Sequence, residues 1–569
     1  MKKNFLAFLI VMLLPFAAFA HDFVVDGICY NVVSENELTC EVTFYGEQYS
    51  DESRNFYKDV VYVPEKVSFN GKEYSVIAIG ERAFSGNEEL LSVVLPGSIV
   101  SIEDQAFWSC SKFKSLTVPA SVRFLRNLPF GYLPSLEYLA VEEGNPVYDS
   151  RGGCNAIINT QKNSLIVGCK STVIPDGVET IADCAFVTGG GYWDEHETLE
   201  LDVPGSVKVI EMQAFAGCRQ LSAVTLHEGL ESIGARAFCG TSVSRIVIPA
   251  SVSKIDATAF QACDSLRSIK VKRGNKVYDS RKGCNAIIES ATARLIAGCP
   301  ATVIPEGVAS IGEQAFYSSA IKEVKFPSSL KTIESRAFAS CRELQKVVIP
   351  GNVKSVESSA FWSCMIEEVV VEDGVETIEA RAFAACRNLR EVSLPASLKK
   401  FGETGRFNAG VFPYCPELRR VKMASGNEKY YCNGNSIVEK ESLTLIDGWG
   451  AGKCNLRNGY VKLRPKKIAE SAFSGHEYIT YIIIPETVEE IDRNAFAGCI
   501  GLHTVVCAAA VPPVLEEDAF PLKGGMYNHD LPLMERCVLV VPEGSLEAYR
   551  NAPGWKEFKH IKGIRFAGY

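Results

Sequence analysis

The sequence predicts a right-handed solenoid of the α/β-type or mainly β class, with a long parallel sheet and about 22–23 residues in each coil. Three observations predict it. Phenylalanines recur, almost always after alanine; neighbouring ones are mostly 22 to 24 residues apart; and a short V-x-I segment lies between them. Such a period indicates coils that bury their apolar faces only by stacking on one another. The repeat phenylalanines are Phe84, Phe107, Phe130, Phe186, Phe215, Phe238, Phe260, Phe316, Phe338, Phe361, Phe383, Phe412, Phe473, Phe496 and Phe520.

Each repeat unit combines a strand with a turn. The V-x-I segment alternates and is β-branched, which predicts a short strand. A proline follows it, as at Pro249, Pro350 and Pro395, and ends the strand because proline cannot donate to a ladder. Ala-Phe is expected in a tight turn or short helix on the other side of the coil, where the small alanine permits close approach and the phenylalanine fills the core.

A second, longer repeat interrupts the first. The segment GNPVYDSRGGCNAII recurs as GNKVYDSRKGCNAII 130 residues later, and a weaker third copy begins GNEKYYCNGNSIV. Apolar runs flank a polar turn in each copy, so the three blocks, near 144–170, 274–300 and 426–454, are predicted to be β-hairpins inserted in the stack. One further coil per block gives about 18 coils, and a sheet on the order of 85 Å long.

The first twenty residues are expected to be a signal peptide. Lys2 and Lys3 precede an apolar run, and Ala18-Phe19-Ala20 resembles a cleavage site. The apolar run is short for a membrane anchor, and no second long apolar segment follows. The mature chain is therefore expected to lack a transmembrane segment and to be exported, with an extracellular, cell-surface or periplasmic location.

Residues 21–75 lack the repeat and are expected to form an N-terminal β cap. Alternating apolar residues flank polar turns there, one of which is Asn70-Gly71. A solenoid needs both ends covered, because open sheet edges pair with other chains. The repeats are expected to fill 76–530 as one elongated domain, which is expected to be a monomer.

The full pattern I-x-x-x-A-F-x-x-C-x-x-L-x-x-V-x-I-P-x-x-V resembles the BspA-like class of bacterial leucine-rich repeats. The hairpin motif N-x-x-Y-x-S-x-x-G is also typical of that family, and the ending VPEGSLEAYRNAPGWKEFKHI is similar to its C-terminal cap, expected here over 531–569. The resemblance covers nearly the whole mature chain. It implies a secreted or surface-displayed binding or adhesion protein and names no ligand.

Twenty cysteines fall into distinct groups. Those three residues after a repeat phenylalanine are expected to stack as small buried hydrophobic residues; they are Cys110, Cys218, Cys263, Cys341, Cys364, Cys386, Cys415 and Cys499. Others flank hairpins and could form cross-strand disulfides or stay free thiols, since the Cα separation must fall in a narrow window. The possible pairs are Cys154 with Cys169, Cys284 with Cys299, and Cys29 with Cys40.

The sequence contains no recognisable catalytic or metal-binding motif. Its seven histidines are scattered, and none has a local spacing to Cys or Ser that suggests nucleophilic catalysis. No convergent cysteine pair of the C-x-x-C kind occurs. A non-enzymatic protein without cofactor or metal is therefore expected. A net charge of −9 and a pI near 5.6 disfavour nucleic acid as a partner.

Two surfaces could bind a partner. One is the outward face of the strands, which mixes charges of both signs with exposed valines; its candidates are Tyr138, Asp202, Arg245, Lys270, Lys325, Lys346, Arg420, Lys422 and Tyr481. The other is an insertion that carries Tyr192, Trp193, Asp194 and His196. Each also has an ordinary explanation, as strand propensity or as a solvated loop.

Three functions compete. A protein ligand, such as a host or matrix protein bound for adhesion, is favoured because an extended surface suits a large partner. A glycan- or nutrient-binding envelope protein is the alternative, against which the lack of an aromatic ladder counts. A hydrolase with a site spread over several coils is a remote third.

Overall fold

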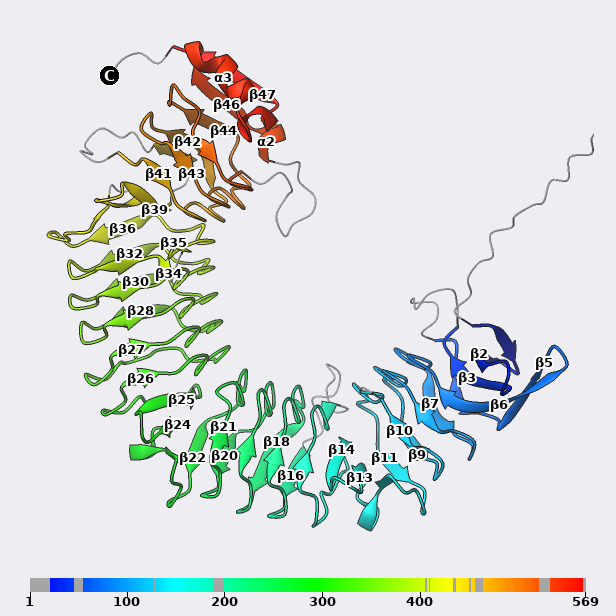
Figure 1. Ribbon diagram of the computed structural model, residues 1–569. Helices are drawn as coiled ribbons and strands as arrows, with labels where there is room; N and C mark the ends of the chain where they lie inside the picture. The colour runs from blue at the N-terminus through cyan, green and yellow to red at the C-terminus, as the bar shows by residue number, and fades with distance from the viewer. Residues whose placement is uncertain are drawn as a thin grey trace, which may run out of the picture. The chain divides into compact units, whose positions relative to one another are not determined.

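The computed structural model describes residues 21–45, 55–126, 128–187, 199–404, 407–408, 410–432, 436–449, 452–455, 464–520 and 533–565 (Figure 1). The chain forms two compact units, residues 1–220 (unit 1) and 221–569 (unit 2). Its coils make a β-solenoid of about 19 turns with few helices, which confirms the expected fold class and lies close to the 18 coils counted from the sequence. The expected signal peptide lies outside the described residues.

Most coils contribute their V-x-I strand to a parallel sheet, named here the front sheet. Partners lie one coil apart, as Val347 pairs with Val369 and Val369 with Val392. In unit 1 its strands are β4 (Asp59–Tyr62), β7 (Leu90–Val94), β9 (Ser115–Val118), β11 (Tyr138–Val141) and β16 (Leu199–Val203). In unit 2 they are β18 (Leu221–Leu226), β20 (Arg245–Ile248), β22 (Ser268–Val271), β28 (Lys346–Ile349), β30 (Glu368–Val371), β32 (Glu391–Leu394), β36 (Arg420–Met423), β40 (Gly452–Asn455), β42 (Ile479–Ile484), β44 (Thr504–Cys507), β46 (Val538–Pro542) and β47 (His560–Ile564).

A second set of strands, only two residues long, forms the rear sheet on the other side of the core. Sequence patterning did not predict it, because two residues cannot show an alternation. In unit 1 these strands are β8 (Ser101–Ile102), β10 (Phe124–Leu125), β15 (Thr180–Ile181) and β17 (Val209–Ile210). In unit 2 they are β19 (Ser232–Ile233), β21 (Lys254–Ile255), β26 (Ser310–Ile311), β27 (Thr332–Ile333), β29 (Ser355–Val356), β31 (Thr377–Ile378), β33 (Lys400–Phe401), β41 (Lys467–Ile468), β43 (Glu490–Ile491) and β45 (Val514–Leu515).

Longer hairpin strands precede each run of the rear sheet. At the N-terminus they are β1 (Phe23–Val25), β2 (Ile28–Ser34), β3 (Thr39–Thr43), β5 (Lys66–Phe69) and β6 (Lys72–Ile79). The first block supplies β12 (Tyr148–Asp149), β13 (Ala156–Asn159) and β14 (Ser164–Gly168), and the second supplies β23 (Tyr278–Asp279), β24 (Ala286–Glu289) and β25 (Arg294–Gly298). The third supplies β37 (Tyr430–Cys432), β38 (Ser436–Glu439) and β39 (Thr444–Gly448), and a small separate pair is β34 (Glu403–Thr404) with β35 (Phe407–Asn408).

Phenylalanine rings stack along the core, one ring per coil. Phe316 and Phe338 have centroids 4.8 Å apart, and Phe338 and Phe361 lie 5.2 Å apart with an interplanar angle of 3°. The Ala-Phe segment is a turn rather than a helix. Backbone hydrogen bonds connect the Ala-Phe turns of adjacent coils. The amide of Phe338, for example, donates to the carbonyl of Ala360 at 2.8 Å.

Thiols form a second ladder beside the rings. The eight cysteines that follow a repeat phenylalanine by three residues are buried, as the sequence predicted. Each thiol also donates a hydrogen bond to the phenylalanine carbonyl of the preceding coil; Cys364 reaches Phe338 at 3.0 Å, and Cys386 reaches Phe361 at 3.2 Å. Burial raises the pKa of Cys364, so this thiol keeps the proton that it donates. The ladder therefore satisfies backbone carbonyls as well as filling space.

Replacement of Cys364 separates these two roles. Serine and alanine are nearly the same size, but only serine can donate to the Phe338 carbonyl. We expect Cys364→Ser to be more stable than Cys364→Ala by about 0.5–1.5 kcal/mol, the net worth of a typical hydrogen bond. Urea unfolding of both variants measures the difference. Equal stability, or a more stable alanine variant, would mean that the thiol only fills space.

Of the two states that the sequence left open, the structure has the hairpin cysteines as free thiols. In the first block Ala156 pairs with Gly168 and Ile157 with Val167, and a β-bulge follows. If this register is extended, Cys154 lies opposite Lys170 and not opposite Cys169. Because neighbouring residues of a strand point to opposite faces, the side chains of Cys154 and Cys169 then do not face each other. The second block has the same bulge, so Cys284 and Cys299 are kept apart in the same way.

The first hairpin also keeps its cysteines apart. Cys29 pairs with Thr43, whereas Cys40 pairs with Val32 on the same two strands. The two cysteines therefore lie at different rungs of the ladder, and both are free and fully buried.

The C-terminal segment packs against the last coil. It contains α2 (Leu533–Arg536), α3 (Leu546–Asn551) and the short 3-10 helices Glu543–Ser545 and Trp555–Glu557 around strands β46 and β47 (Figure 1). The Trp555 indole is fully buried and donates to the Pro513 carbonyl at 2.7 Å. The 3-10 turns Arg151–Gly153 and Arg281–Gly283 lie in the first two blocks.

Candidate binding surface

The residues expected on the outward face lie on the solvent side, but they do not form one site. Lys325 is exposed outside any strand, Tyr481 is half-buried, and the remaining ones are exposed on front-sheet strands. Those others are Tyr138 on β11, Asp202 on β16, Arg245 on β20, Lys270 on β22, Lys346 on β28, and Arg420 and Lys422 on β36. The loop candidates Tyr192, Trp193, Asp194 and His196 lie outside the described residues.

Carboxylates of adjacent coils neutralise the cationic candidates on β28 and β36. Lys346 lies opposite Glu368, and their charged atoms are 2.7 Å apart. Glu391 lies 2.7 Å from Lys422 and 3.6 Å from Arg420. The hydrogen bond from Lys422 holds the pKa of Glu391 below its usual range. Because these opposite charges largely cancel, this part of the front sheet offers little net charge to attract a charged partner.

Unit 1 presents a different surface. Asp59, the exposed first residue of β4, belongs to its charged rim. The outward positions that follow it on β4, and those on β7, β9 and β11, carry no charge, and we name this set the neutral face. Tyr62 pairs with Val94 across β4 and β7, and Ser115 pairs with Tyr138 across β9 and β11. The neutral face comprises Val60, Tyr62, Ser92, Val94, Ser115, Thr117, Tyr138 and Ala140. Its large side chains are open to solvent, with exposed fractions of 38% for Val60, 70% for Tyr62, 48% for Val94 and 52% for Tyr138.

Charged pairs border the neutral face at the beginnings of its strands. Lys112 and Glu89 are 3.0 Å apart and precede β9 and β7. Lys170 lies 3.5 Å from Glu137, the residue before β11. An apolar and hydroxyl-bearing centre with a charged rim is the usual arrangement of a protein-binding patch, whose centre is depleted in charge and enriched in tyrosine.

Sequence reasoning found Tyr138 but missed Val60 and Tyr62. Both lie in 21–75, which was assigned to the N-terminal cap. Strand β4 pairs in parallel with β7, so the front sheet begins inside that range. The signal was present, since Val61-Tyr62-Val63-Pro64 repeats the V-x-I-P motif of the later coils.

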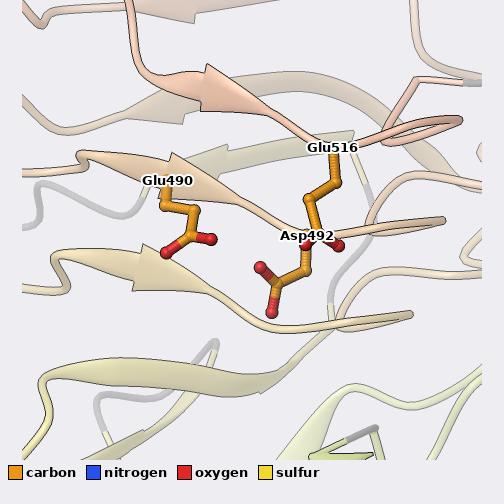
Figure 2. Close-up of side chains that lie close together, drawn as sticks. All are labelled: Glu490, Asp492 and Glu516. Atoms are coloured by element: carbon orange, nitrogen blue, oxygen red, sulfur yellow. The ribbon is translucent and has the colours of Figure 1, made fainter.

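Three carboxylates in unit 2 gather on two adjacent coils. Glu490, Asp492 and Glu516 each place one oxygen within 4.8 Å of the others (Figure 2). The ammonium of Lys467 lies 3.2 Å from Glu490 and 2.8 Å from Asp492. A cation of the protein itself therefore already pairs with two of the three carboxylates, and we assign no metal to the cluster.

Two ionisable groups are buried deep in unit 2. Asp447, which is 1% exposed, accepts hydrogen bonds from the amides of Val411 and Phe412 at 2.5 and 3.4 Å. Burial outweighs these bonds and raises the pKa of Asp447 to about 8. His476 is also 1% exposed, takes the place of a ladder cysteine three residues after Phe473, and has a pKa lowered to about 4 by burial. Neither group lies in a sequence motif that would predict this burial.

Among the described residues, no helix combines the length and the apolar character that crossing a bilayer requires. Comparison with curated proteins gave no significant match.

Several solved structures resemble the chain. The pneumococcal vaccine antigen PcpA is 15% identical with a TM-score of 0.37, and the match covers 87% of this chain and 94% of that one. A leucine rich cell surface protein from Faecalibacterium prausnitzii A2-165 is 20% identical with a TM-score of 0.32, covering 86% and 94%. A leucine-rich repeat protein from Bacteroides ovatus ATCC 8483 is 20% identical with a TM-score of 0.26, covering 96% and 100%.

A family model decides the relationship. The BspA type Leucine rich repeat region matches in 6 copies, over residues 65–151, 192–292, 309–433 and 408–521, which together exceed half of the chain. These ranges contain most of the Ala-Phe turns and V-x-I strands and all eight cysteines of the thiol ladder described above. The chain therefore belongs to the BspA type leucine rich repeat family.

Proposed function

We propose that the chain is an exported, non-enzymatic binding protein that holds another protein on its neutral face. The observation that carries this proposal is the contrast between the two parts of the front sheet. Outward charges on β28, β30, β32 and β36 neutralise one another, whereas the neutral face on β4, β7, β9 and β11 is uncharged and exposes two tyrosines. Tyrosine offers a large contact area and a hydroxyl at a low entropic cost, so it is common among the residues that dominate binding.

The spacing of the tyrosines favours a protein over a glycan. Tyr62 and Tyr138 lie on the two outer strands in the order β11-β9-β7-β4. At about 4.8 Å per strand they are roughly 14 Å apart across the sheet. Neighbouring sugar rings would need aromatic side chains on adjacent strands, and Val94 and Thr117 lie between them. A protein surface can bridge that distance with small side chains.

Export rests on the N-terminal residues alone. The charged Lys2-Lys3, the apolar run after them and Ala18-Phe19-Ala20 support a cleaved signal peptide. N-terminal sequencing of the protein recovered from the envelope and medium of expressing cells tests this: we expect the mature protein to begin at His21. A product that retains Met1 in the cytoplasm would contradict export without affecting the proposed binding face.

An array of extracellular matrix proteins and host glycans tests the class of partner. The mature chain from His21 onward is applied with the double variant Tyr62→Ser/Tyr138→Ser as a comparison. We expect saturable binding to a protein, lost in the double variant. Phe124→Ser is the matched control, because Phe124 is 51% exposed on β10 of the rear sheet. A glycan hit without a protein hit would replace the proposal by the glycan alternative, and silence on both would remove its support.

A further inference from the structure

The second hairpin block interrupts a hydrogen-bond ladder that continues between ordinary coils. In that ladder the amide of a repeat phenylalanine donates to the carbonyl of the next coil's alanine, as Phe238 does to Ala259 and Phe316 to Ala337, both at 2.8 Å. A hairpin block has no Ala-Phe turn. The amide of the phenylalanine before the block therefore has no alanine carbonyl of a next turn to which it can donate. For the amide of Phe260, the part of the chain that the structure describes offers no backbone or side-chain partner. A buried donor left in this way is costly.

The third block shows how the chain satisfies such a donor. There the carboxylate of Asp447 accepts the amides of Val411 and Phe412, which is the repeat phenylalanine before that block. Asp447 lies opposite Ile437 in the hairpin. The residue at the same place in the second block is Ala297, which lies opposite Ile287. Ala297 has the Cβ of Asp447 but lacks its carboxylate.

A cavity lies where that carboxylate is missing. Phe260, Ala297 and Ser319 line it, together with Gln261 and Gln314, whose side chains hydrogen-bond to each other at 2.9 Å. Ser319 is only 8% exposed, and its hydroxyl finds no hydrogen-bond partner among the described residues. Two residues that line this cavity therefore carry a donor without a partner among the described residues: the amide of Phe260 and the hydroxyl of Ser319. No charged side chain is part of the lining.

We infer that this cavity binds one small oxygen acceptor in the role that Asp447 plays in the third block. The occupant that these walls suit is a water molecule, because the lining offers no positive charge to pair with a buried carboxylate ion. Its oxygen can accept from the amide of Phe260 and from the hydroxyl of Ser319. Buried water at such sites makes two to four hydrogen bonds and is part of the fold. The inference is independent of the proposed partner.

High-resolution crystal structures of the whole mature chain test the inference, grown once with sodium formate and once with sodium chloride. We expect density within hydrogen-bonding distance of the Phe260 amide and the Ser319 hydroxyl. A single peak in both crystals supports the inference. A planar three-atom density in the formate crystal, or an empty cavity in both crystals, would overturn it.

Two variants at Ala297 add a second test. Ala297→Val introduces the residue that Val167 supplies in the first block, and it should expel the occupant. Ala297→Asp should place its own carboxylate on the Phe260 amide, as Asp447 does at Phe412. Density that persists unchanged in the Ala297→Val variant would overturn the inference, because the occupant would then lie elsewhere.

Discussion

Asp447→Asn is expected to remove most of a loss of stability that we expect for the native chain between pH 6.5 and pH 8. The pKa of Asp447 is about 8 in the folded chain and about 3.9 in an unfolded one. The folded state therefore keeps a proton that the unfolded state has released. Stability falls as pH rises between these two pKa values, by about 1.4 kcal/mol per pH unit.

His476 opposes this trend at lower pH. Its pKa is about 4 in the folded chain and about 6.5 when unfolded. The unfolded state takes up the proton first as the pH falls, so this residue lowers stability from pH 6.5 down to pH 4. The two slopes cancel in that range. From pH 6.5 to 8 Asp447 makes the largest single contribution, a loss of about 2 kcal/mol. Buried thiols whose pKa is raised, such as Cys364 and Cys386, add a smaller loss near pH 8, because the unfolded chain begins to release their protons there.

Urea unfolding at pH 5, 6.5 and 8 measures this profile. The native chain should be level from pH 5 to 6.5 and fall to pH 8, whereas Asp447→Asn should rise to pH 6.5 and then lose only the smaller amount that the buried thiols contribute. Val411 and Phe412 donate to different oxygens of Asp447, so asparagine keeps an acceptor for only one of the two amides. The comparison therefore uses the shape of the pH profile and not the absolute stability. Asp518→Asn, at an exposed position, should behave as the native chain does. Parallel profiles for the native chain and Asp447→Asn would show that Asp447 is not buried as described.

Gly298→Ala is expected to destabilise unit 2 by about 1–3 kcal/mol, the usual cost of overpacking a core. A Cβ on Gly298 would lie 2.2 Å from the Phe316 ring. The other two blocks repeat this contact, since a Cβ on Gly168 would lie 2.5 Å from Phe186, and one on Gly448 would lie 2.0 Å from Phe473. In each block the glycine leaves the space into which the next coil's phenylalanine packs.

A rescue variant separates overpacking from other effects of the substitution. Phe316→Leu shortens the ring that meets the new methyl group, so Gly298→Ala/Phe316→Leu should lose less stability than the two single changes added together. Gly544→Ala is the control, because a Cβ there meets nothing within 4 Å. Urea midpoints measure all four variants. A Gly298→Ala variant as stable as the control would contradict the packing account.

The repeat could be predicted from the sequence because its period, its strands and its stacked phenylalanines are local patterns. Whatever depended on register could not. One β-bulge after Ile157 shifts the pairing and separates Cys154 from Cys169. Likewise, the sequence does not show that Lys346 and Lys422 are paired. Glu368 and Glu391 lie beside them only because of the parallel register of the strands.

The neutral face was missed for another reason. Val60 and Tyr62 precede the first Ala-Phe turn. The spacing of the phenylalanines therefore gives no signal for their strand. Position alone assigned them to the cap, although the V-x-I-P motif around Tyr62 is intact. The burial of Asp447 and of His476 could not be predicted either. Asp447 occupies a core position that Ala297 fills in the second block, and His476 occupies the position of a ladder cysteine.

The central claim is that the neutral face holds the partner. Surface plasmon resonance against the protein found on the array tests it most directly, with Tyr62→Ser/Tyr138→Ser compared with Lys270→Glu/Lys325→Glu. Removal of hot-spot tyrosines should weaken binding by about 2 kcal/mol or more, roughly thirtyfold in Kd, while the charge reversals should leave Kd within about threefold. The opposite result, with affinity lost on charge reversal and kept without the tyrosines, would contradict the claim.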